Sequence, residues 1–360
     1  VKYNLLKKPC TVKDFLTKKV KINEEFNKKE IRIGDIIEFG SYPQSEVKDE
    51  TLLAELNAQT LEWISYGYYS GTIDEQVPGD FMKYADVTYN EAKYRAVTFT
   101  DYRPLATAYG TSEDYSCQPA CGYETGIVYW FIYEPIQWCI LDPNEGFVLS
   151  ETIIDSQAYQ NTVFRNNRVW YQDSSCEKLA SDYEASSIRE WLNDDFYNTA
   201  FTDEEKAEIF SSVQENTLLS DSVYDGEATN DKIFLLSYDD VTNEEYGFVS
   251  HKREDVSRQA KGTDYAKCQG VAEIPTDMYF PWWLRTGEEY GCSGFIAEEG
   301  GSHSDDSAPC WTCIGVRPAM KMNLNQDFTN EMCKIIKELC MIPAPSHHEE
   351  NRAQYCKNKL

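Results

Sequence analysis

The residues of this chain whose types most suggest metal chemistry lie near its end. In the stretch IPAPSHHEENRAQYC (342–356), His347 and His348 stand directly before Glu349 and Glu350. Imidazole, thiolate and carboxylate groups are the ligands that zinc prefers. Four consecutive residues cannot all turn toward one ion without unusual backbone geometry. The residue types therefore suggest zinc, but their spacing does not, and we expect no zinc site here.

Two close cysteine pairs are further candidates. Three residues separate Cys117 from Cys121, and two separate Cys310 from Cys313. Four thiolates could bind zinc if the fold brought the pairs together. Twelve cysteines are many for a cytosolic protein and few for a disulfide scaffold of this length. Unpaired thiols, disulfides and zinc therefore stay open, with unpaired thiols favoured and zinc not expected.

An acidic loop near the end of the core could bind a hard cation. Its carboxylates belong to Glu298, Glu299, Asp305 and Asp306. Calcium prefers several such oxygen ligands. A solvated loop is the commoner outcome for such a run. Calcium is therefore possible in this loop, and we expect no resident cofactor.

Familiar catalytic patterns are missing from the core. It contains no glycine-rich phosphate loop, no HExxH and no GxSxG. Its two histidines, His251 and His303, lie far apart in the sequence. We assign no catalytic residues and no metal ligands.

Composition narrows the class of protein. A net charge of −27 over 360 residues disfavours binding to a nucleic-acid backbone, whose phosphates would be repelled. The 25 Tyr, 16 Phe and 8 Trp are typical of β-rich cores and of sugar- or peptide-binding surfaces. No apolar run reaches the roughly 20 residues of a membrane span, and no secretory apolar core follows Val1. Residues 1–30 form a lysine-rich arm. We expect both ends to be truncated, so the compartment stays undetermined.

The elements that position these groups begin with strands. Residues 31–44 predict a strand closed by a Gly-Ser-Tyr-Pro turn. Residues 126–155 give the strongest β signal, because apolar residues alternate from Trp130 to Ile140. The turn residues from Asp142 to Gly146 then predict a hairpin.

Two helices follow. Capping boxes at Ser187–Glu190 and Thr202–Glu205 predict their starts, and the second helix should run through Ile209. Residues 231–241 read as a strand again. Strands, two helices and further strands predict one α+β domain over residues 31–324.

Seven ordered motifs in this core resemble a known family. They are EFGSYPQ, VYWFIYEPIQW, SSIREWLNDDFYNTAF, NDKIFLLSYDDV, GTDYAKCQG, WWLRT and GVRPAM. The chain resembles the bacterial domain-of-unknown-function family DUF6273 over about residues 31–324. That family is common in gut-dwelling Gram-positive bacteria, and the resemblance implies no particular activity.

The core is similar, more weakly, to the C-type-lectin-like fold that includes formylglycine-generating enzymes. There too, helices precede a strand of WxLR type, and a GxRP-like strand closes the sheet. The resemblance implies a mixed domain with antiparallel strands, two central helices and long loops. Fold-level analogy does not fix function.

This arrangement predicts a ligand site over the long loops. Trp282 and Trp283 alternate along a strand, so one should be core and the other near the surface. Arg285 and Arg317 need carboxylate or carbonyl partners, and a bracing role is expected for both, with ligand contact as the alternative. The predicted ligand-binding residues are Trp283, Arg285, Tyr290, Glu298, Glu299, Asp305 and Asp306.

The tail, residues 325–360, resembles the first segment of zinc peptidases of the aminoacyl-histidine dipeptidase and peptidase T kind. In those enzymes a helix, an IPxPSxxE turn and a second helix open the catalytic domain, and the metal ligands lie in stretches that this chain lacks. We interpret the tail as a truncated, non-catalytic peptidase start.

These patterns together favour a non-enzymatic ligand-binding or interaction module. Its ligand would be a small molecule, a glycan or a peptide, and the oligomeric state stays open. The alternative is an enzyme, either a fragment of a zinc dipeptidase fusion or an oxidase like the formylglycine-generating enzymes.

Overall fold

The computed structural model describes ten segments of the chain. They are residues 31–70, 77–106, 117–161, 181–216, 226–251, 253–272, 279–287, 293–297, 299–303 and 311–324. The lysine-rich arm and the peptidase-like tail lie outside the described residues, so the predictions made for them stay predictions.

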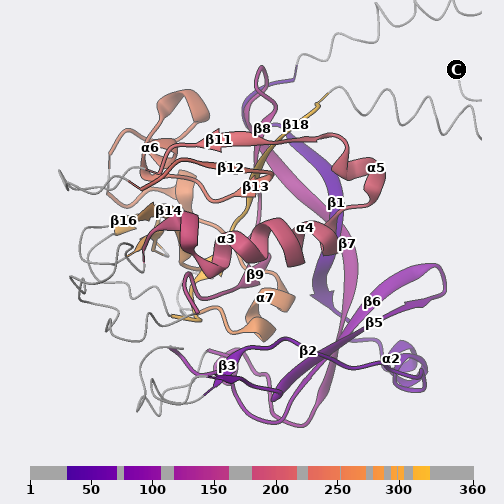
Figure 1. Cartoon of the computed structure of the whole chain (residues 1–360). Coiled ribbons are helices and arrows are strands. Elements are labelled where there is room, and N and C mark those ends of the chain that lie inside the picture. Colours follow the sequence, from indigo (N-terminus) through magenta and orange to yellow (C-terminus); the bar gives the residue numbers. More distant parts are fainter. Residues whose placement is uncertain are drawn as a thin grey trace, which may run out of the picture.

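The strand β7 (Val128–Asp142) is the spine of a nine-stranded sheet. The strand β1 (Ile36–Glu46) pairs antiparallel along one edge of it. Two other strands pair with successive parts of β7, first β6 (Ala92–Phe99) and then β8 (Phe147–Ser150). A strand has only two edges, so β6 and β8 lie one after the other along the second edge. Figure 1 shows β1 and β7 running between an upper and a lower part of the molecule.

Each part of the sheet adds strands outward from β7. The lower part contains β6, β5 (Met82–Tyr89) and β2 (Ile64–Ser65). The upper part contains β8, β18 (Ala319–Met322), β10 (Ile209–Phe210) and β13 (Ile233–Phe234). β6 pairs with the first part of β7 and β8 with its last part, and no described strand pairs with the second edge between them. The two parts of the sheet therefore separate at this point.

A second sheet and two short hairpins complete the β structure. The second sheet has the order β16 (Ser302–His303), β15 (Ser293–Ile296), β14 (Trp282–Gly287), β17 (Gly315–Val316) and β9 (Asp155–Ser156). The hairpins pair β11 (Ser212–Gln214) with β12 (Thr229–Asp231) and β3 (Tyr69–Ser70) with β4 (Val77–Pro78). Among the paired named strands, only β14 and β17 run parallel.

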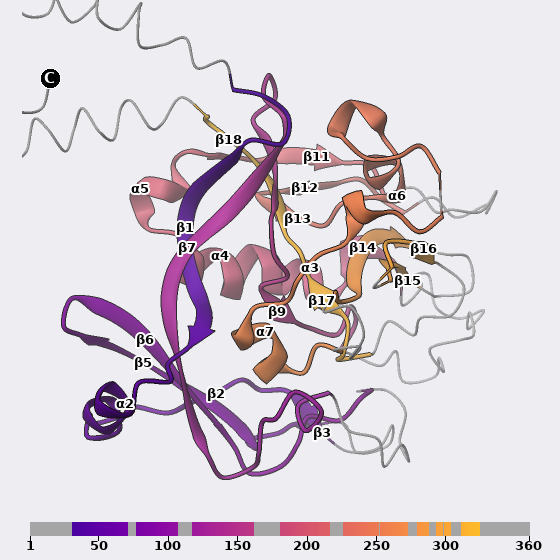
Figure 2. The same cartoon turned by 180° about the vertical axis from the view of Figure 1, so that it is seen from behind.

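The helices are short. A continuous helical run comprises α3 (Ser187–Trp191), the π-helical turn η3 (Leu192–Phe196) and α4 (Tyr197–Ala200). The others are α2 (Glu50–Asn57), α5 (Asp203–Lys206), α6 (Tyr238–Val241) and α7 (Asp264–Gln269), with 3₁₀ turns at Tyr183–Ala185, Glu244–Tyr246 and Val256–Arg258. Figure 2 shows the molecule from behind, with β1 and β7 in front of this run.

The structure confirms a mixed α and β architecture with mostly antiparallel strands and few helices. One hydrophobic core reaches from Phe39 to Met322. A second, smaller core around Leu56 and Trp130 lies under the lower part of the sheet. None of the described helices has the length and apolar character needed to cross a bilayer.

Local predictions at β1 and α3 need correction. The Gly-Ser-Tyr-Pro segment does not end the first strand, because β1 continues through it with a bulge between Glu38 and Ser41. Gly40 makes this possible with a φ of +67°, a backbone region that glycine adopts readily. The first helix is capped by Ser186 and not Ser187, since Ser186 accepts from the Arg189 N–H. The Thr202–Glu205 capping box is confirmed.

Other boundaries also differ from prediction. The helix after Thr202 ends at Lys206, and Ile209 belongs to strand β10. The predicted strand over 231–241 turns into helix α6 after Ser237, which caps that helix together with Asp240. The acidic loop expected around Glu298, Glu299, Asp305 and Asp306 includes strand β16 (Ser302–His303).

The expectation that one of the two adjacent tryptophans lies near the surface is wrong. Trp282 and Trp283 are both 0% exposed, since other segments cover both faces of β14. The Trp282 indole donates to the Arg258 carbonyl, and that of Trp283 donates to the Gln157 carbonyl.

Candidate functional site

A column of two arginines and three tyrosines runs through the lower part of the molecule. Arg95 of β6 lies 4.2 Å from the ring centroid of Tyr84 on β5. Tyr84 contacts Tyr66 at 4.8 Å between centroids, and Tyr66 stacks on Tyr68 at 5.0 Å with 6° between the planes. Arg103 closes the column, 3.7 Å from the centroid of Tyr68. Guanidinium groups are attracted to ring faces in this way, so the two cations bracket the three rings.

Helix α7 fixes the hydroxyl groups of this column. Tyr265 and Gln269 are four residues apart and so lie on one face of the helix. Tyr68 donates to Gln269 Oε1 (2.7 Å), and Gln269 Nε2 donates to the Tyr66 hydroxyl (3.0 Å). The hydroxyls of Tyr66 and Tyr265 are 2.8 Å apart. The column is therefore held along its side by hydrogen bonds as well as by stacking.

The same network ends at a buried carboxylate, Asp155 on β9. It is 1% exposed and accepts from the Tyr42 hydroxyl (2.8 Å), the Ser156 N–H (2.7 Å) and Gln157 Nε2 (3.0 Å). Gln157 Nε2 also donates to the Tyr68 hydroxyl, which joins Asp155 to the column. Burial raises the pKa of Asp155 to about 6, although these hydrogen bonds and the charge of Arg103 lower it in part.

At the opposite end the column meets the surface. Arg95 donates from Nε and Nη2 to the two oxygens of Asp86, at 2.7 and 2.8 Å. The Tyr133 hydroxyl donates to the same carboxylate (2.8 Å), and the Lys93 ammonium lies 4.0 Å from the Tyr133 ring centroid. Burial alone would raise the pKa of Asp86, but Arg95, Tyr133 and Lys93 together lower it below its usual range.

The helical run faces this end of the column. Phe196 packs edge-on against Tyr42 of β1, at 5.2 Å between centroids, and Tyr42 packs edge-on against Tyr265. Burial and the neighbouring Asp194 and Glu190 raise the pKa of Asp195, and Arg95 is close enough to lower it in part.

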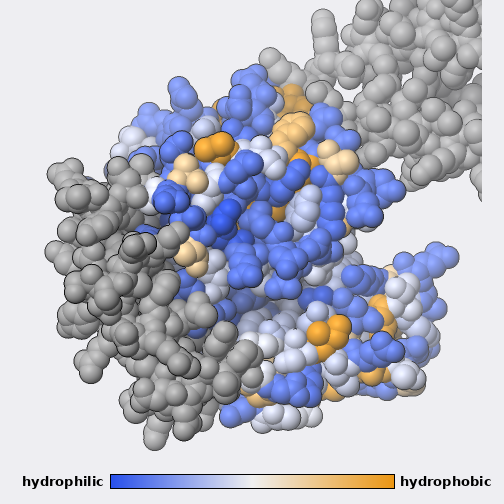
Figure 3. All heavy atoms as spheres, viewed as in Figure 1, coloured by the Kyte–Doolittle hydropathy of each residue, from blue (hydrophilic) through white to orange (hydrophobic). Residues whose placement is uncertain are grey.

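We call this group of side chains the Arg95 site. It contains Tyr84, Asp86, Lys93, Arg95 and Tyr133 from the lower part of the sheet, and Asp195 from the helical run. In Figure 3 the surface is indented between the part with α4 and α5 and the part with β5 and β6.

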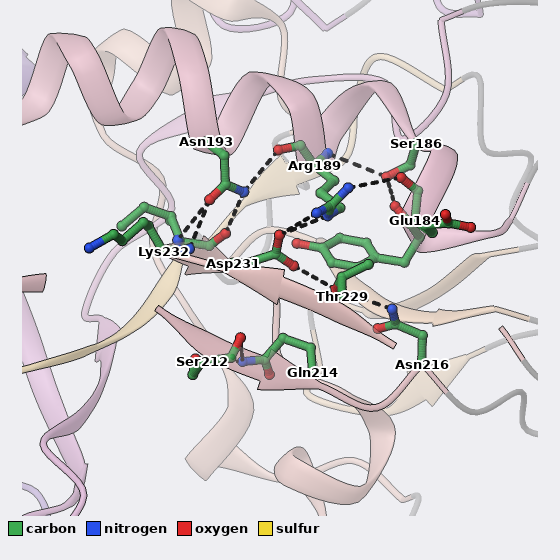
Figure 4. Close-up of polar contacts among 12 residues, drawn as sticks. Glu184, Ser186, Arg189, Asn193, Ser212, Gln214, Asn216, Thr229, Asp231 and Lys232 are labelled. Atoms are coloured by element: carbon green, nitrogen blue, oxygen red, sulfur yellow. Dashed lines mark hydrogen bonds and ion pairs between the residues drawn. The ribbon is translucent and has the colours of Figure 1, made fainter. Parts of the chain in front are cut away.

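A second buried polar cluster lies between α3 and β12 (Figure 4). Arg189 contacts Asp231 Oδ1 through Nε (2.8 Å) and Nη2 (2.7 Å), and the Thr229 hydroxyl donates to Asp231 Oδ2 (2.6 Å). Asn216 donates to the Thr229 hydroxyl, and Arg189 Nη1 donates to the Glu184 carbonyl. These contacts tie the β11–β12 hairpin to the helix. We interpret this cluster as a structural brace, because its only charged pair is satisfied internally.

The structure brings together two of the ligand-binding residues predicted from sequence. Trp283 is fully buried, and Arg285 is 7% exposed and donates to Asp240 Oδ2 (2.7 Å) and the Leu235 carbonyl (2.8 Å). Tyr159 joins them, since it packs against Trp283 and donates to the Arg285 carbonyl. Arg317 is also buried, with Nε donating to the Ser150 carbonyl. Both arginines have the carbonyl or carboxylate partners expected of a brace, and ligand contact by Trp283 and Arg285 stays a prediction.

Ligand contact by the remaining predicted site residues stays a prediction. Glu299 is half-buried, and Tyr290, Glu298, Asp305 and Asp306 lie outside the described residues. Within the described segments, no group of three or more His, Cys, Asp or Glu side chains could hold a metal ion. Cys310 also lies outside them, so the expectations about zinc and calcium stay predictions.

Sequence reasoning missed the Arg95 site. Four of its members lie on the β5–β6 hairpin, but Tyr133 and Asp195 come from β7 and the helical run, 47 and 109 residues after Asp86. The one signal available was the excess of tyrosine, which did not indicate where the rings would gather.

Comparison with known proteins gives one match. The family described as Domain of unknown function (DUF6273) matches residues 144–324, about half of the chain. The chain belongs to this family, which confirms the resemblance over that range. Residues 31–143, also expected within it, precede the match. No curated protein and no solved structure matches the chain, so the lectin-like and peptidase-like resemblances stay predictions.

Proposed function

We propose that this DUF6273 protein is a non-enzymatic binding module and that the Arg95 site binds a glycan. The observation that carries the proposal is a surface of tyrosines and paired charges held in place by a buried network. Tyr133 and Lys93 are partly exposed, whereas Arg95 and Tyr265 behind them are buried. Such a surface offers aromatic area and hydrogen-bonding groups that are already oriented.

Preorganisation supports binding at this place. Arg95 is fixed by two bonds to Asp86, one to Tyr265 and the ring of Tyr84. A side chain that is ordered before binding loses little conformational entropy when a ligand arrives. The buried network behind the site therefore favours affinity without itself touching the ligand.

The charge balance favours a neutral, hydroxyl-rich ligand. Arg95 and Lys93 are matched by Asp86 and by the nearby Asp195. A strongly charged ligand would break these pairs or meet a like charge. A sugar presents hydroxyls that both donate and accept, together with apolar C–H faces that suit tyrosine rings.

A binding role fits these residues better than catalysis does. Asp155 has a raised pKa but is sealed from solvent, and both of its oxygens accept hydrogen bonds. The carboxylate oxygens of Asp86 are likewise engaged. The enzyme alternatives are a zinc dipeptidase fragment, which needs the tail, and an oxidase like the formylglycine-generating enzymes. Those enzymes use a cysteine pair, with which Cys310 and Cys313 invite comparison. Both alternatives remain rival proposals.

A C-type-lectin-like arrangement of the core is also part of this proposal. It is supported by the order of helices and strands and by the WWLRT and GVRPAM strands. If it holds, the loops near Glu299 offer a second place for a ligand, as the sequence predicts.

The test is a glycan array with the full chain, followed by calorimetry on the best ligand. Tyr133→Ala should weaken binding about tenfold, the loss of roughly one good contact. Tyr197→Ala is the matched control, because Tyr197 is also a partly exposed tyrosine beside a lysine, Lys206, but lies outside the site. Affinity within about twofold of the original is expected for it. Absence of glycan binding, or cleavage of the bound glycan, would overturn the proposal.

A further inference from the structure

Arg95 has more N–H groups than the acceptors that the described residues offer it. A guanidinium carries five N–H groups. Those of Arg95 that bond to described residues are Nε and one on Nη2, both to Asp86, and one on Nη1, to Tyr265 (3.3 Å). One N–H on each Nη thus has no acceptor among the residues that the structure describes, although the side chain is only 5% exposed.

The tyrosine pair behind Arg95 adds a third surplus donor. The two hydroxyls of Tyr66 and Tyr265 share one hydrogen bond, which uses one of their two protons. Their other neighbours, Arg95 Nη1 and Gln269 Nε2, donate to the pair and cannot accept from it. One hydroxyl proton is therefore left without an acceptor in the described part of the chain. A buried donor without a partner is costly, so this place favours a ligand oxygen.

The surrounding charges select the kind of oxygen. The charge of Arg95 is already matched by Asp86, and Asp195 lies across the site near Glu190 and Asp194. A carboxylate ligand would be repelled by this acidic side, and the whole chain has a net charge of −27. A neutral carbonyl is the strong acceptor that avoids this repulsion.

Asp195 supplies the complementary acceptor. Its carboxylate accepts no hydrogen bond from any described residue and is exposed on the helical run. A ligand amide has a carbonyl for the donors around Arg95 and an N–H for Asp195. We propose, resting on the glycan-binding function above, that the site recognises the acetamido group of an N-acetylated amino sugar.

Four soluble probes at near-physiological salt test this specificity with the full chain. They are tetramers of N-acetylglucosamine, glucose and galacturonic acid, and an N-acetylated tetrapeptide. The acetylated sugar should bind about tenfold more tightly than the glucose tetramer, as expected for one hydrogen bond to a charged group. The galacturonic acid tetramer and the tetrapeptide should bind more weakly still.

Substitutions test which residues cause the preference for the acetylated sugar. Asp195→Ala should lower the ratio of acetylated to unacetylated sugar affinity about fivefold, because the amide N–H loses its acceptor. Asp194→Ala, the adjacent exposed carboxylate, should leave that ratio unchanged. The double variant Tyr66→Phe/Tyr265→Phe removes both hydroxyls and keeps the rings, and it should lower the same ratio if it folds. If the double variant does not fold, Asp195→Ala, which changes a surface residue, is the deciding test.

The outcomes separate the two proposals. If no probe and no array glycan binds, the proposed function fails. If sugars bind without preference for the acetamido group, only the present inference fails. Preference for the galacturonic acid tetramer would make this an anion site, and equal binding of the tetrapeptide would make it an amide site with no demand for a sugar. Either result overturns the inference.

Discussion

Two aspartates in this protein are almost equally buried and yet have different surroundings. Asp155 is 1% exposed and Asp231 is 2% exposed. Asp231 has a guanidinium directly on one oxygen and a hydroxyl on the other. Among the residues that the structure describes, the donors to Asp155 are all uncharged, namely Tyr42, Ser156 and Gln157. The two aspartates therefore differ in the groups that bond to them and not in how deeply they are buried.

The difference also follows the organisation of the chain. Asp231 and Arg189 both lie within the segment that matches the family, so their pair holds that segment together. Asp155 lies in the same segment but bonds to Tyr42, and through Gln157 to Tyr68, which both precede it. One carboxylate is a local brace, and the other joins the family segment to the region that carries most of the Arg95 site.

The largest effect should come from breaking the brace. Arg189→Met leaves the Asp231 carboxylate buried with only the Thr229 hydroxyl. Removing one partner of a buried ion pair costs about 3–5 kcal/mol of unfolding free energy, because the remaining charge is uncompensated. Urea unfolding at pH 7 measures the loss. Lys48→Met removes one member of an exposed ion pair whose lysine is 74% exposed, and it should cost about 0.5 kcal/mol or less. Equal losses in the two variants would contradict the assignment of Asp231 and Arg189 as a brace.

The next effect concerns pH and Asp155. Its pKa is raised in the folded state to about 6 from an ordinary 3.8, so the folded protein binds more protons between these values. Stability should therefore fall as pH rises from about 4 to about 6, by roughly 3 kcal/mol in all, and this contribution should be constant above that range.

The variant Asp155→Asn isolates this contribution from that of other acids. Its urea-unfolding profile against pH, subtracted from that of the original chain, should show the slope between about pH 4 and 6. Tyr197→Phe should keep the slope, since Tyr197 contacts neither Asp155 nor another buried carboxylate that the structure describes. A flat difference profile would mean that Asp155 titrates in its ordinary range.

A smaller effect should follow from removing a single donor to Asp155. Tyr42→Phe keeps the ring against Phe196 and Tyr265 but removes the hydroxyl that donates to Oδ2. Hydrogen bonds to charged groups contribute about 1.5–3 kcal/mol, so a loss near 2 kcal/mol is expected at pH 7. This bond also lowers the pKa of Asp155, so its removal should extend the pH-dependent range upward.

Tyr197→Phe is the control for that measurement. The Tyr197 hydroxyl donates to the Lys206 carbonyl at 3.4 Å, near the limit of a hydrogen bond, on a partly exposed side chain. It should cost about 0.5 kcal/mol or less. If Tyr42→Phe costs no more than this control, the hydroxyl does not stabilise the Asp155 carboxylate.

The sequence predicted those features that neighbouring residues determine. The hairpin around Asp142–Gly146 was correct because alternation and turn chemistry are local, and the Thr202 cap was correct for the same reason. The bulge at Gly40 was missed because its cause is distant. A Cβ there would lie 2.6 Å from the Phe201 ring, 161 positions further along the chain.

The candidate site could not be predicted for the same physical reason. Some contacts of the column are local, such as Tyr66 on Tyr68, but the hydrogen bonds from Gln269, Tyr265 and Gln157 join residues that only the fold brings together. Types such as Tyr and Gln carry no local signature of such a network. The predicted exposure of one tryptophan failed because strand alternation gives the two faces of β14 but not what covers them. The periodicity of a sequence thus predicts its helices and strands, whereas the residues that contact one another across the fold are known only from the tertiary structure.

The smallest predicted effect concerns an ion pair at the protein surface. Glu145 and Lys321 form an ion pair at 3.2 Å between β18 and the β7–β8 turn, with side chains 62% and 30% exposed. Water already solvates both charges, so Glu145→Gln should change the unfolding free energy by about 0.5 kcal/mol or less, and added salt should reduce even that. The Arg189–Asp231 pair is shorter (2.7 and 2.8 Å) and its carboxylate is buried, so a larger cost is expected from breaking that pair. A loss of several kcal/mol from Glu145→Gln in urea unfolding would show that ion pairing alone stabilises this fold, and the contrast drawn between Asp231 and Asp155 would then lose its basis.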